Sequence, residues 1–143
     1  MRLYDKEPTG TGPAERFTGD VRVDAIPGGD VPPLVTGGIV RFAAGAHTAW
    51  HVHARGQTLH ILDGVAIVHA RDGETIIAHP GQTVHTPAGQ WHWHGATPDQ
   101  PMTHLALSDT VPHGDGPAVT WAEHVTDQEY DEAARAAENG TNP

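Results

Sequence analysis

Four side chains in two separated stretches of this sequence could together bind one divalent metal ion. His51 and His53 are two residues apart, so in a β-strand their side chains point to the same face. Gln57 follows four residues later, and Gly56 lets the chain turn between them. His92 comes from a later segment. Three imidazoles and one amide oxygen form an open metal site with room for water or a substrate.

The glutamine sets the charge of this predicted site. A carboxylate at position 57 would cancel one unit of the ion's charge, whereas the amide of Gln57 cancels none, so the ion keeps a charge of about +2. We therefore expect weaker metal retention, stronger Lewis acidity and a preference for substrates that develop negative charge on a bound oxygen. Mn, Fe, Co, Ni, Zn and Cu all accept such ligands, so the residue types alone leave the metal open.

Short strands must position these side chains, and the sequence favours them. Its 17 glycines and 12 prolines among 143 residues are typical of many strands joined by tight turns rather than of a helical bundle. Asp63-Gly64, Asp72-Gly73 and Pro80-Gly81 mark three of the turns. The predicted strands are Leu34 to Phe42, His47 to His53, Thr58 to Leu62, Val65 to Ala70, Thr75 to Ala78, Thr83 to Thr86, Trp91 to Gly95 and Met102 to Leu107. Such a series indicates an all-β sandwich, jelly roll or barrel.

The two ends of the chain differ from this central part. Residues 1–33 form an N-terminal arm, in which Val21-Arg22-Val23 is a candidate edge strand, and residues 34–110 form the barrel. Residues 111–143 form a C-terminal extension. There, Thr126 and Glu129 have capping-box spacing, an alanine-rich stretch follows, and Gly140 is a favourable stop. This pattern predicts a mostly solvated helix from Asp127 to Glu138.

Two motifs resemble those of the cupin family and occur in the order that the family requires. Gly45-x5-His51-x-His53-x3-Gln57-x6-Gly64 is similar to the first cupin motif, with glutamine where glutamate is usual. Gly81-x5-Pro87-x-Gly89-x2-His92 is similar to the second, with Ala96 in place of its closing asparagine. The resemblance covers about Leu34 to Leu107. It implies a double-stranded β-helix, the cupin jelly-roll barrel, whose interior holds the metal through the motif residues. The alternatives are a degenerate cupin without metal, or His51 and His53 as buried structural histidines.

A narrower resemblance extends over nearly the whole chain. Thr48-Ala49-Trp50-His51, His92-Trp93-His94-Gly95-Ala96 and Met102-Thr103-His104-Leu105-Ala106 are similar to small bacterial cupins related to carboxymuconolactone decarboxylases. Some members of that group are manganese-dependent hydroxynitrile lyases, which cleave or form cyanohydrins. The resemblance therefore implies a metal-dependent lyase that uses Mn, with Fe, Ni, Co or Zn as alternatives. The chain departs from the group at His47 and at Ala54-Arg55, where arginine and Pro-Leu are expected, so its substrate preference could differ.

Two further histidines are candidates for proton transfer. His94 follows His92 by two residues, and His104 alternates with Met102 and Ala106, so both could face the barrel interior. The resemblance implies that His104 is the general base, which takes a proton from a substrate hydroxyl, and that His94 is its helper. Either could instead be a core histidine that is hydrogen-bonded to the backbone.

Four other residues are candidates for the substrate pocket. Thr48 could hydrogen-bond a substrate oxygen, and it could equally be an ordinary strand residue. Gly38, Val40 and Phe42 alternate along one predicted strand and could line the pocket together. Core packing explains these three residues equally well.

The composition restricts the possible partners. The formal net charge of −10 disfavours binding to nucleic acid and to anionic membranes. The absence of cysteine excludes a disulfide framework and a thiolate site. With no apolar leader or transmembrane run, we expect a cytoplasmic protein that acts on a small molecule, and the resemblance implies a homodimer or homotetramer. The same fold and ligands also suit two other functions, an Fe-dependent dioxygenase and a non-catalytic small-molecule-binding cupin.

Overall fold

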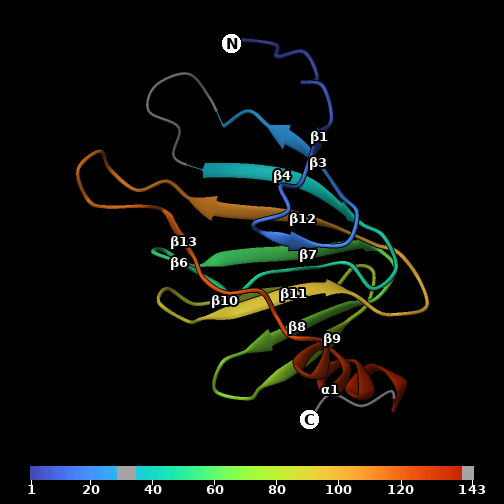
Figure 1. Ribbon diagram of the computed structural model, residues 1–143. Helices are drawn as coiled ribbons and strands as arrows, with labels where there is room; N and C mark the ends of the chain where they lie inside the picture. The colour runs from blue at the N-terminus through green and yellow to red at the C-terminus, as the bar shows by residue number, and fades with distance from the viewer. Residues whose placement is uncertain (29–34, 140–143) are drawn as a thin grey trace.

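Antiparallel strands dominate the computed structural model, which describes residues 1–28 and 35–139 (Figure 1). In chain order they are β1 (Gly10–Thr11), β2 (Phe17–Thr18), β3 (Val21–Ile26), β4 (Val35–Phe42), β5 (His47–Thr48), β6 (His51–His53), β7 (Gln57–Asp63), β8 (Ala66–Ala70), β9 (Thr75–Ala78), β10 (Thr83–Thr86), β11 (His92–Ala96), β12 (Met102–Asp109) and β13 (Val119–Trp121). One helix follows, α1 (Asp127–Glu138). The predicted all-β jelly-roll class with a short C-terminal helix is confirmed.

Two sheets enclose the core. One has the strand order β1-β3-β4-β12-β7-β10. In the other the order is β13-β6-β11-β5-β2, and β8 pairs with both β11 and β9. Alternate side chains of each strand point inward because the side-chain period of a strand is two. The inward-facing apolar residues form one cluster, which includes Val40, Phe42, Leu59, Ile61, Val68, Val84 and Met102. The inner faces of both sheets therefore meet in one interior.

The predicted strand from His47 to His53 is in fact two strands, β5 and β6. Between them the backbone bonds to distant segments: Ala49 N donates to Arg16 O at 2.8 Å, and Trp50 N donates to Glu123 O at 3.0 Å. The chain thereby changes its neighbours, because β5 pairs with β2 whereas β6 pairs with β13. The N-terminal segment thus flanks β5, and the C-terminal segment flanks β6, the strand that carries the first two site histidines.

Strand β3 is not the edge strand that the sequence analysis predicts. It pairs with β4 on one side and with β1 on the other, so β1 is the outermost strand. Asp24 on β3 holds the arm in place, since its carboxylate accepts hydrogen bonds from Thr9 and Arg41 and lies 3.3 Å from Lys6 Nζ. The hydrogen bonds from Thr9 and Arg41 lower the pKa of Asp24 to about 2. The homodimer or homotetramer stays a prediction.

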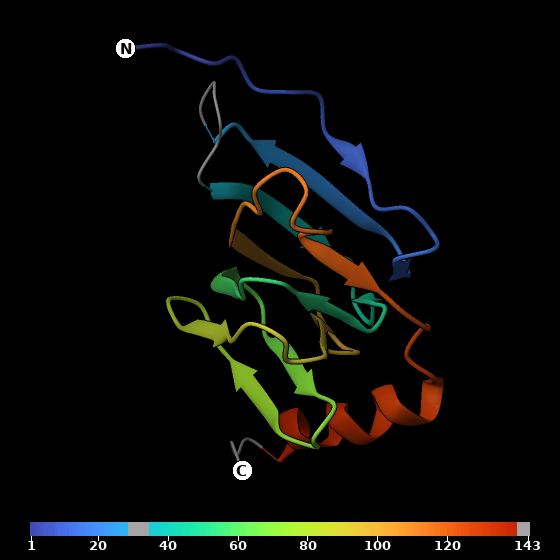
Figure 2. The same cartoon turned by 90° about the vertical axis from the view of Figure 1, so that its left-hand side faces the viewer.

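Helix α1 spans the predicted residues, and one of its faces is buried while the rest is solvated, as expected. Thr126 caps it, because its hydroxyl accepts a hydrogen bond from Glu129 N at 3.1 Å. The helix runs along the outer side of β8 and β9 (Figure 2). Its buried side chains are Tyr130, Ala133 and Ala134. The Tyr130 hydroxyl donates to Ala96 O at 2.7 Å, which ties the helix to the end of β11.

Two predicted boundaries, Leu34 and Gly140, lie outside the described residues. The division of the chain into arm, barrel and extension stays a prediction, although β3 and β13 extend the two barrel sheets from either side. Within residues 1–28 and 35–139, no helix is long and apolar enough to cross a membrane.

Candidate metal centre

Strands β6 and β11 bring three histidines together inside the barrel. His51 and His53 share the inner face of β6, and His92 at the start of β11 is the direct cross-strand partner of His51. All three side chains are buried, with 1%, 6% and 1% of their surface exposed. One ring nitrogen from each lies within 4.8 Å of the others. This arrangement is compact enough for all three to bind one metal ion.

A glycine brings the fourth predicted ligand to the same place. Gly56 has a φ of +82°, and a β-carbon there would lie 2.8 Å from Thr86 O, so only glycine fits this turn. The turn places Gln57 first on β7 with its side chain buried. Its Oε1 atom lies 3.3 Å from Nε2 of His92. The amide therefore reaches the histidine cluster.

Hydrogen bonds on the far side of each ring orient the three histidines. Nδ1 of His51 is 2.9 Å from Ala49 O, and Nδ1 of His92 is 3.0 Å from Gln90 O. A carbonyl oxygen only accepts, so Nδ1 carries the ring proton in both residues and Nε2 has the lone pair. In His53, Nδ1 lies 3.4 Å from Ser108 Oγ.

The ring nitrogens that face the centre of the cluster would be satisfied better by a cation than by one another. Nε2 of His53 is buried and has no hydrogen-bond partner among the described residues. With the proton of His92 on Nδ1, its Nε2 and the Oε1 of Gln57 are two lone-pair atoms in contact. Buried lone pairs need a donor or a cation between them. The donor set, three nitrogens and one amide oxygen, suits a divalent metal.

Burial keeps these rings in the form that binds metals. It lowers the pKa of His53 to about 4, and it lowers the pKa of His92 in spite of the hydrogen bond to Gln90. For His51, burial and the nearby His92 lower the pKa well below its usual value. All three imidazoles are therefore neutral near pH 7, which is the state that donates a lone pair to a metal.

The C-terminal strand adds a support that the sequence analysis does not identify. Trp121 on β13 lies opposite His51 in the strand pairing, and its ring stacks on the imidazole at 4.5 Å with an interplanar angle of 28°. The guanidinium of Arg16 lies 5.3 Å from the indole centre. Outer contacts of this kind fix the orientation of metal-binding histidines. Only the pairing of β13 with β6 reveals this role for Trp121.

His94 and His104 form a buried pair beside the cluster. His94 Nδ1 and His104 Nε2 are 3.1 Å apart, and the other nitrogen of each ring has no partner among the described residues. The His94 ring centre lies 5.2 Å from that of His51, whereas the ring of His104 contacts His94 and Phe42. Burial lowers the pKa of His104 to about 4 and, with repulsion from His104, lowers that of His94 well below its usual value. Both rings are neutral near pH 7.

The predicted pocket residues all lie on or near this interior. The Thr48 hydroxyl accepts a hydrogen bond from His94 N at 3.2 Å and lies 3.5 Å from Nδ1 of His51. Phe42 contacts the rings of both His94 and His104. Val40 is the cross-strand partner of His104, and Gly38 lies two residues before it on β4. Their proximity to substrate stays a prediction.

Two cavities adjoin the histidine cluster. The first, of about 250 Å³, touches His92 and is lined by Val68, Ala70, Glu74, Ile76, Val84, His85, Thr86, Pro87 and Gln90. The second, of about 310 Å³, touches Gln57 and is lined by Val35, Arg55, Gly56, Thr58, His85, Leu107, Ser108 and Asp109. The sequence analysis singles out Arg55 as a departure from related cupins, and it does not identify Val68, Ile76 and Val84. Strand alternation marks these three as inward-facing, yet only the pairing of strands places them beside His92.

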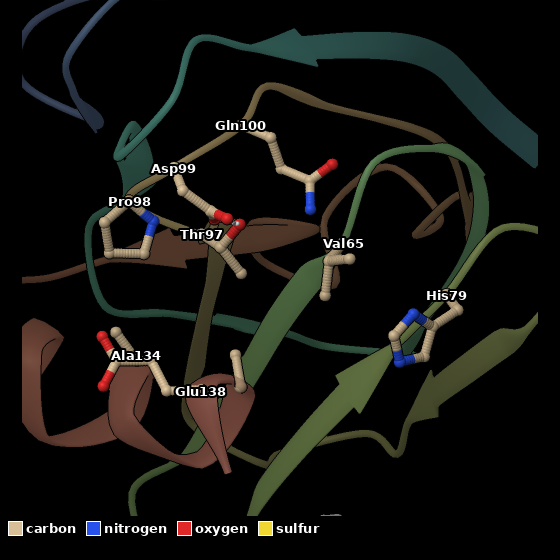
Figure 3. Close-up of a pocket in the computed structure, with 9 residues that line it drawn as sticks. Val65, His79, Thr97, Pro98, Asp99, Gln100, Ala134 and Glu138 are labelled. Atoms are coloured by element: carbon tan, nitrogen blue, oxygen red, sulfur yellow. Dashed lines mark hydrogen bonds between the residues drawn. The ribbon is translucent and has the colours of Figure 1, made fainter. Parts of the chain in front are cut away.

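A third cavity lies far from the metal cluster. It has a volume of about 220 Å³ and lies between α1 and the loop after β11, where Thr97, Asp99 and Ala134 line it (Figure 3). Thr97 is five residues beyond His92, which in a strand corresponds to about 16 Å. We therefore assign this cavity no part in the metal chemistry.

Comparisons with known proteins agree with the geometry. Residues 38–108 match the family model described as a cupin domain. The chain is 45% identical over 130 residues to an (R)-mandelonitrile lyase from Granulicella tundricola, covering 91% of this chain and 97% of that protein. The chain is a cupin. A cupin-like protein from Thermotoga maritima has a similar structure, with a TM-score of 0.78 and 29% identity over 93% of this cupin and 97% of that chain. A cupin-2 domain from Rhodospirillum rubrum has a TM-score of 0.67 at 14% identity, covering all of this cupin and 97% of that chain, and shows the shared fold.

The similarity of this cupin to a lyase over nearly its whole length indicates that it is an enzyme. His51, His53 and His92 form a cluster that could hold a metal ion, as the motif spacing predicts.

Proposed function

We propose that this cupin is a metal-dependent lyase that cleaves and forms cyanohydrins, in the manner of a hydroxynitrile lyase. The observation that carries the proposal is a buried pair of neutral histidines, His94 and His104, beside a cluster of three histidines and a glutamine. The 45% identity to an (R)-mandelonitrile lyase supports it. The substrate would be a small molecule with one hydroxyl and one nitrile on the same carbon.

Cleavage of a cyanohydrin requires two proton movements. The hydroxyl loses its proton, the oxygen forms a carbonyl, and the carbon–carbon bond breaks with its electron pair on cyanide. The cyanide then takes a proton and leaves as hydrogen cyanide. An enzyme for this reaction needs a base near the hydroxyl, an acid near the nitrile and positive charge near the oxygen.

The histidine pair contains one base and one acid in either of its tautomers. When the proton between the rings belongs to His104 Nε2, His104 Nδ1 has a lone pair and His94 Nε2 has a proton. When it belongs to His94 Nδ1, these roles are reversed. A proton accepted at one outer nitrogen can therefore be balanced by one released at the other, as the shared proton moves across the 3.1 Å contact.

Ring contacts favour His94 as the residue nearer the substrate. His94 contacts the rings of His51 and His92, whereas His104 lies behind it against Phe42. We therefore assign the base to His94 Nε2, which would take the hydroxyl proton and return it to the departing cyanide, and we assign to His104 the partner role of sharing the positive charge through the 3.1 Å contact, which reverses the roles that the family resemblance implies. Thr48 supports this placement, since its hydroxyl accepts a hydrogen bond from the backbone N–H of His94.

Four residues would hold the metal: His51, His53, Gln57 and His92. When bound there, a divalent ion supplies Lewis acidity that stabilises negative charge on the substrate oxygen. The neutral amide of Gln57 leaves the charge of the ion uncancelled. Manganese is our proposed metal on the basis of the family resemblance, and Fe, Ni, Co and Zn are the alternatives.

The test is turnover of mandelonitrile by protein loaded with Mn²⁺ in the absence of oxygen, followed by the absorbance of benzaldehyde. We expect Mn-dependent cleavage in the wild type. His94→Ala and His104→Ala should each lose about 10²- to 10⁴-fold of kcat while keeping their metal, because general acid–base groups contribute that much. His92→Ala should lose the metal. The matched control His113→Ala replaces an exposed histidine and should keep both the metal and the turnover of wild type.

Two results would overturn the proposal. One is wild-type protein that binds Mn²⁺ and releases no benzaldehyde. The other is full turnover in both His94→Ala and His104→Ala. Oxygen uptake that depends on Fe would instead favour the dioxygenase, for which the same ligands leave positions open.

A further inference from the structure

A tryptophan precedes each of the two histidines that face one another across β6 and β11. Trp50 comes directly before His51, and Trp91 comes directly before His92. Both indoles pack in a second apolar cluster, which also contains Tyr130 of α1, so they lie outside the barrel while the imidazoles lie inside it. Each histidine has its Nδ1 atom near the carbonyl oxygen of the residue before its tryptophan, at 2.9 Å and 3.0 Å. A shift of either tryptophan would therefore move a ring of the metal cluster.

Arg71, which directly follows β8, lies against both tryptophans. Its guanidinium carbon is 4.6 Å from the ring centre of Trp50 and 5.0 Å from that of Trp91. Its backbone N–H also donates to Trp91 O at 2.9 Å. A guanidinium within about 6 Å of an indole ring centre is attracted by the negative face of the ring. One arginine therefore connects the residue before His51 to the residue before His92.

Glu123 adds contacts from the C-terminal segment to the same group. Its carboxylate accepts a hydrogen bond from the guanidinium of Arg71, and its carbonyl oxygen accepts one from Trp50 N at 3.0 Å. The N–H of Ala122 donates to Trp50 O at 2.8 Å. The indole N–H of Trp50 donates to the carboxylate of Glu129 on α1 at 2.9 Å. Trp50 is thus held at its backbone, at its indole nitrogen and at the face of its ring.

The contact of the guanidinium with the two indoles matters more than the ion pair. The side chains of Arg71 and Glu123 are 44% and 63% exposed, and an ion pair at the surface contributes little by itself. Trp50, by contrast, is only 5% exposed. A cation on a buried ring limits the movement of that ring, whereas the carboxylate of Glu123 mainly directs the guanidinium toward it.

We propose that Arg71 is a positioning residue for the metal cluster, which fixes the relative orientation of His51 and His92 by holding Trp50 and Trp91 in place. The proposal rests on the metal site of the proposed function and not on the lyase reaction. Its sign separates it from a simple effect of charge. Removal of a positive charge would by itself favour a bound cation, whereas loss of positioning weakens metal binding.

The test is titration of metal-free protein with Mn²⁺. Arg71→Ala should raise the Kd about 10-fold, the lower end of the range for outer partners of metal ligands, because Arg71 acts through the tryptophans. Arg71→Gln keeps part of the stem without the charge and should show the same rise, which covers the case that Arg71→Ala does not fold. Arg71→Lys keeps a cation near the rings and should recover part of the affinity. The matched control Arg22→Ala removes an arginine of similar exposure, paired with Asp20 on the other sheet, and should leave the Kd within about twofold of wild type.

A spectrum of the bound metal separates positioning from a general loss of stability. Co²⁺ absorbs visible light in bands whose position and intensity depend on the arrangement of its ligands. At saturating Co²⁺, these bands should change in Arg71→Ala and Arg71→Gln and should match wild type in Arg22→Ala. Circular dichroism confirms that each variant is folded.

Two contrary results have different meanings. An unchanged or lower Kd in the folded Arg71→Ala or Arg71→Gln variant, or a Co²⁺ spectrum identical to that of wild type, would overturn the positioning role and leave the metal site in place. Wild-type protein that binds neither Mn²⁺ nor Co²⁺ would overturn the metal site, and the role of Arg71 with it.

Discussion

Replacement of Gln57 by glutamate should tighten metal binding and slow turnover. The side chain is buried, and its Oε1 atom lies 3.3 Å from Nε2 of His92 within the cluster. A carboxylate about 4 Å from a divalent ion attracts it by about 8 kcal/mol at an effective dielectric constant of about 20. Burial of that carboxylate costs several kcal/mol. A net gain of about 2–4 kcal/mol corresponds to a Kd about 30- to 1,000-fold lower.

The same charge should reduce catalysis. It neutralises part of the positive potential that stabilises a developing oxyanion, and a loss of about 1.4 kcal/mol in that stabilisation lowers kcat tenfold. The Kd is measured by titration of metal-free protein with Mn²⁺, with free Mn²⁺ followed by electron paramagnetic resonance, and kcat by benzaldehyde release. Gln128→Glu adds an equal charge on the exposed face of α1 and should change neither quantity. Weaker metal binding or faster turnover in Gln57→Glu would show that the charge argument is wrong.

Three further predictions concern the residues that support the site and the fold. Trp121→Ala should raise the Kd for Mn²⁺ about 10- to 100-fold, because it removes the ring stacked on His51. Trp121→Phe keeps an aromatic ring and should retain most of the affinity. Equal affinity in both variants and wild type would contradict this prediction. The pKa of Asp24 is lowered from 3.8 to about 2, so its carboxylate stabilises the fold above pH 4 and this contribution is lost as the pH falls toward 2. Asp24→Asn should therefore unfold at lower urea concentration than wild type at pH 7, and a difference that stays constant down to pH 2 would refute the assignment. Tyr130→Phe removes the hydroxyl that donates to Ala96 O and should reduce the free energy of unfolding, measured by urea titration, by about 1–3 kcal/mol. Wild-type stability in this variant would rule out a contribution from that hydrogen bond.

Local signals in the sequence predict most of the secondary structure. The helix occupies the predicted residues because the Thr126 cap and the alanine-rich stretch act within a few residues of one another. The strands β9 and β10 likewise match their predicted bounds, since turn residues mark their ends. The buried face of α1 also has a local signal, because Tyr130, Ala133 and Ala134 have the i, i+3, i+4 spacing of an apolar helix face; what the helix sequence does not specify is that β8 and β9 cover it.

The residues of the candidate metal site could be predicted because their spacing is specific, whereas their surroundings could not. His51, His53 and Gln57 belong to one motif, and the family resemblance adds His92 from a second motif. Trp121 lies 68 residues after His53, and nothing local in the sequence relates it to the cluster. The same holds for the aliphatic wall of the neighbouring cavity, because the pairing of β8 with β11 creates it. Long-range strand pairing therefore accounts for what sequence reasoning missed.

The break between β5 and β6 also decides which histidines join the cluster. In one continuous strand, His47 would share a face with His51, and Thr48 would point away from both. The structure shows the opposite, because Thr48 Oγ1 lies 3.5 Å from Nδ1 of His51 while the ring of His47 stacks on Tyr130 of α1 at 4.5 Å. His47 has its Nδ1 2.8 Å from Gly45 O, two residues earlier, as His51 has its Nδ1 near Ala49 O. An oriented, buried and neutral imidazole is therefore not enough to place a histidine in the cluster. The irregular residues between the two strands turn one such ring toward the helix and the other toward the cluster, and they place Thr48 beside His94.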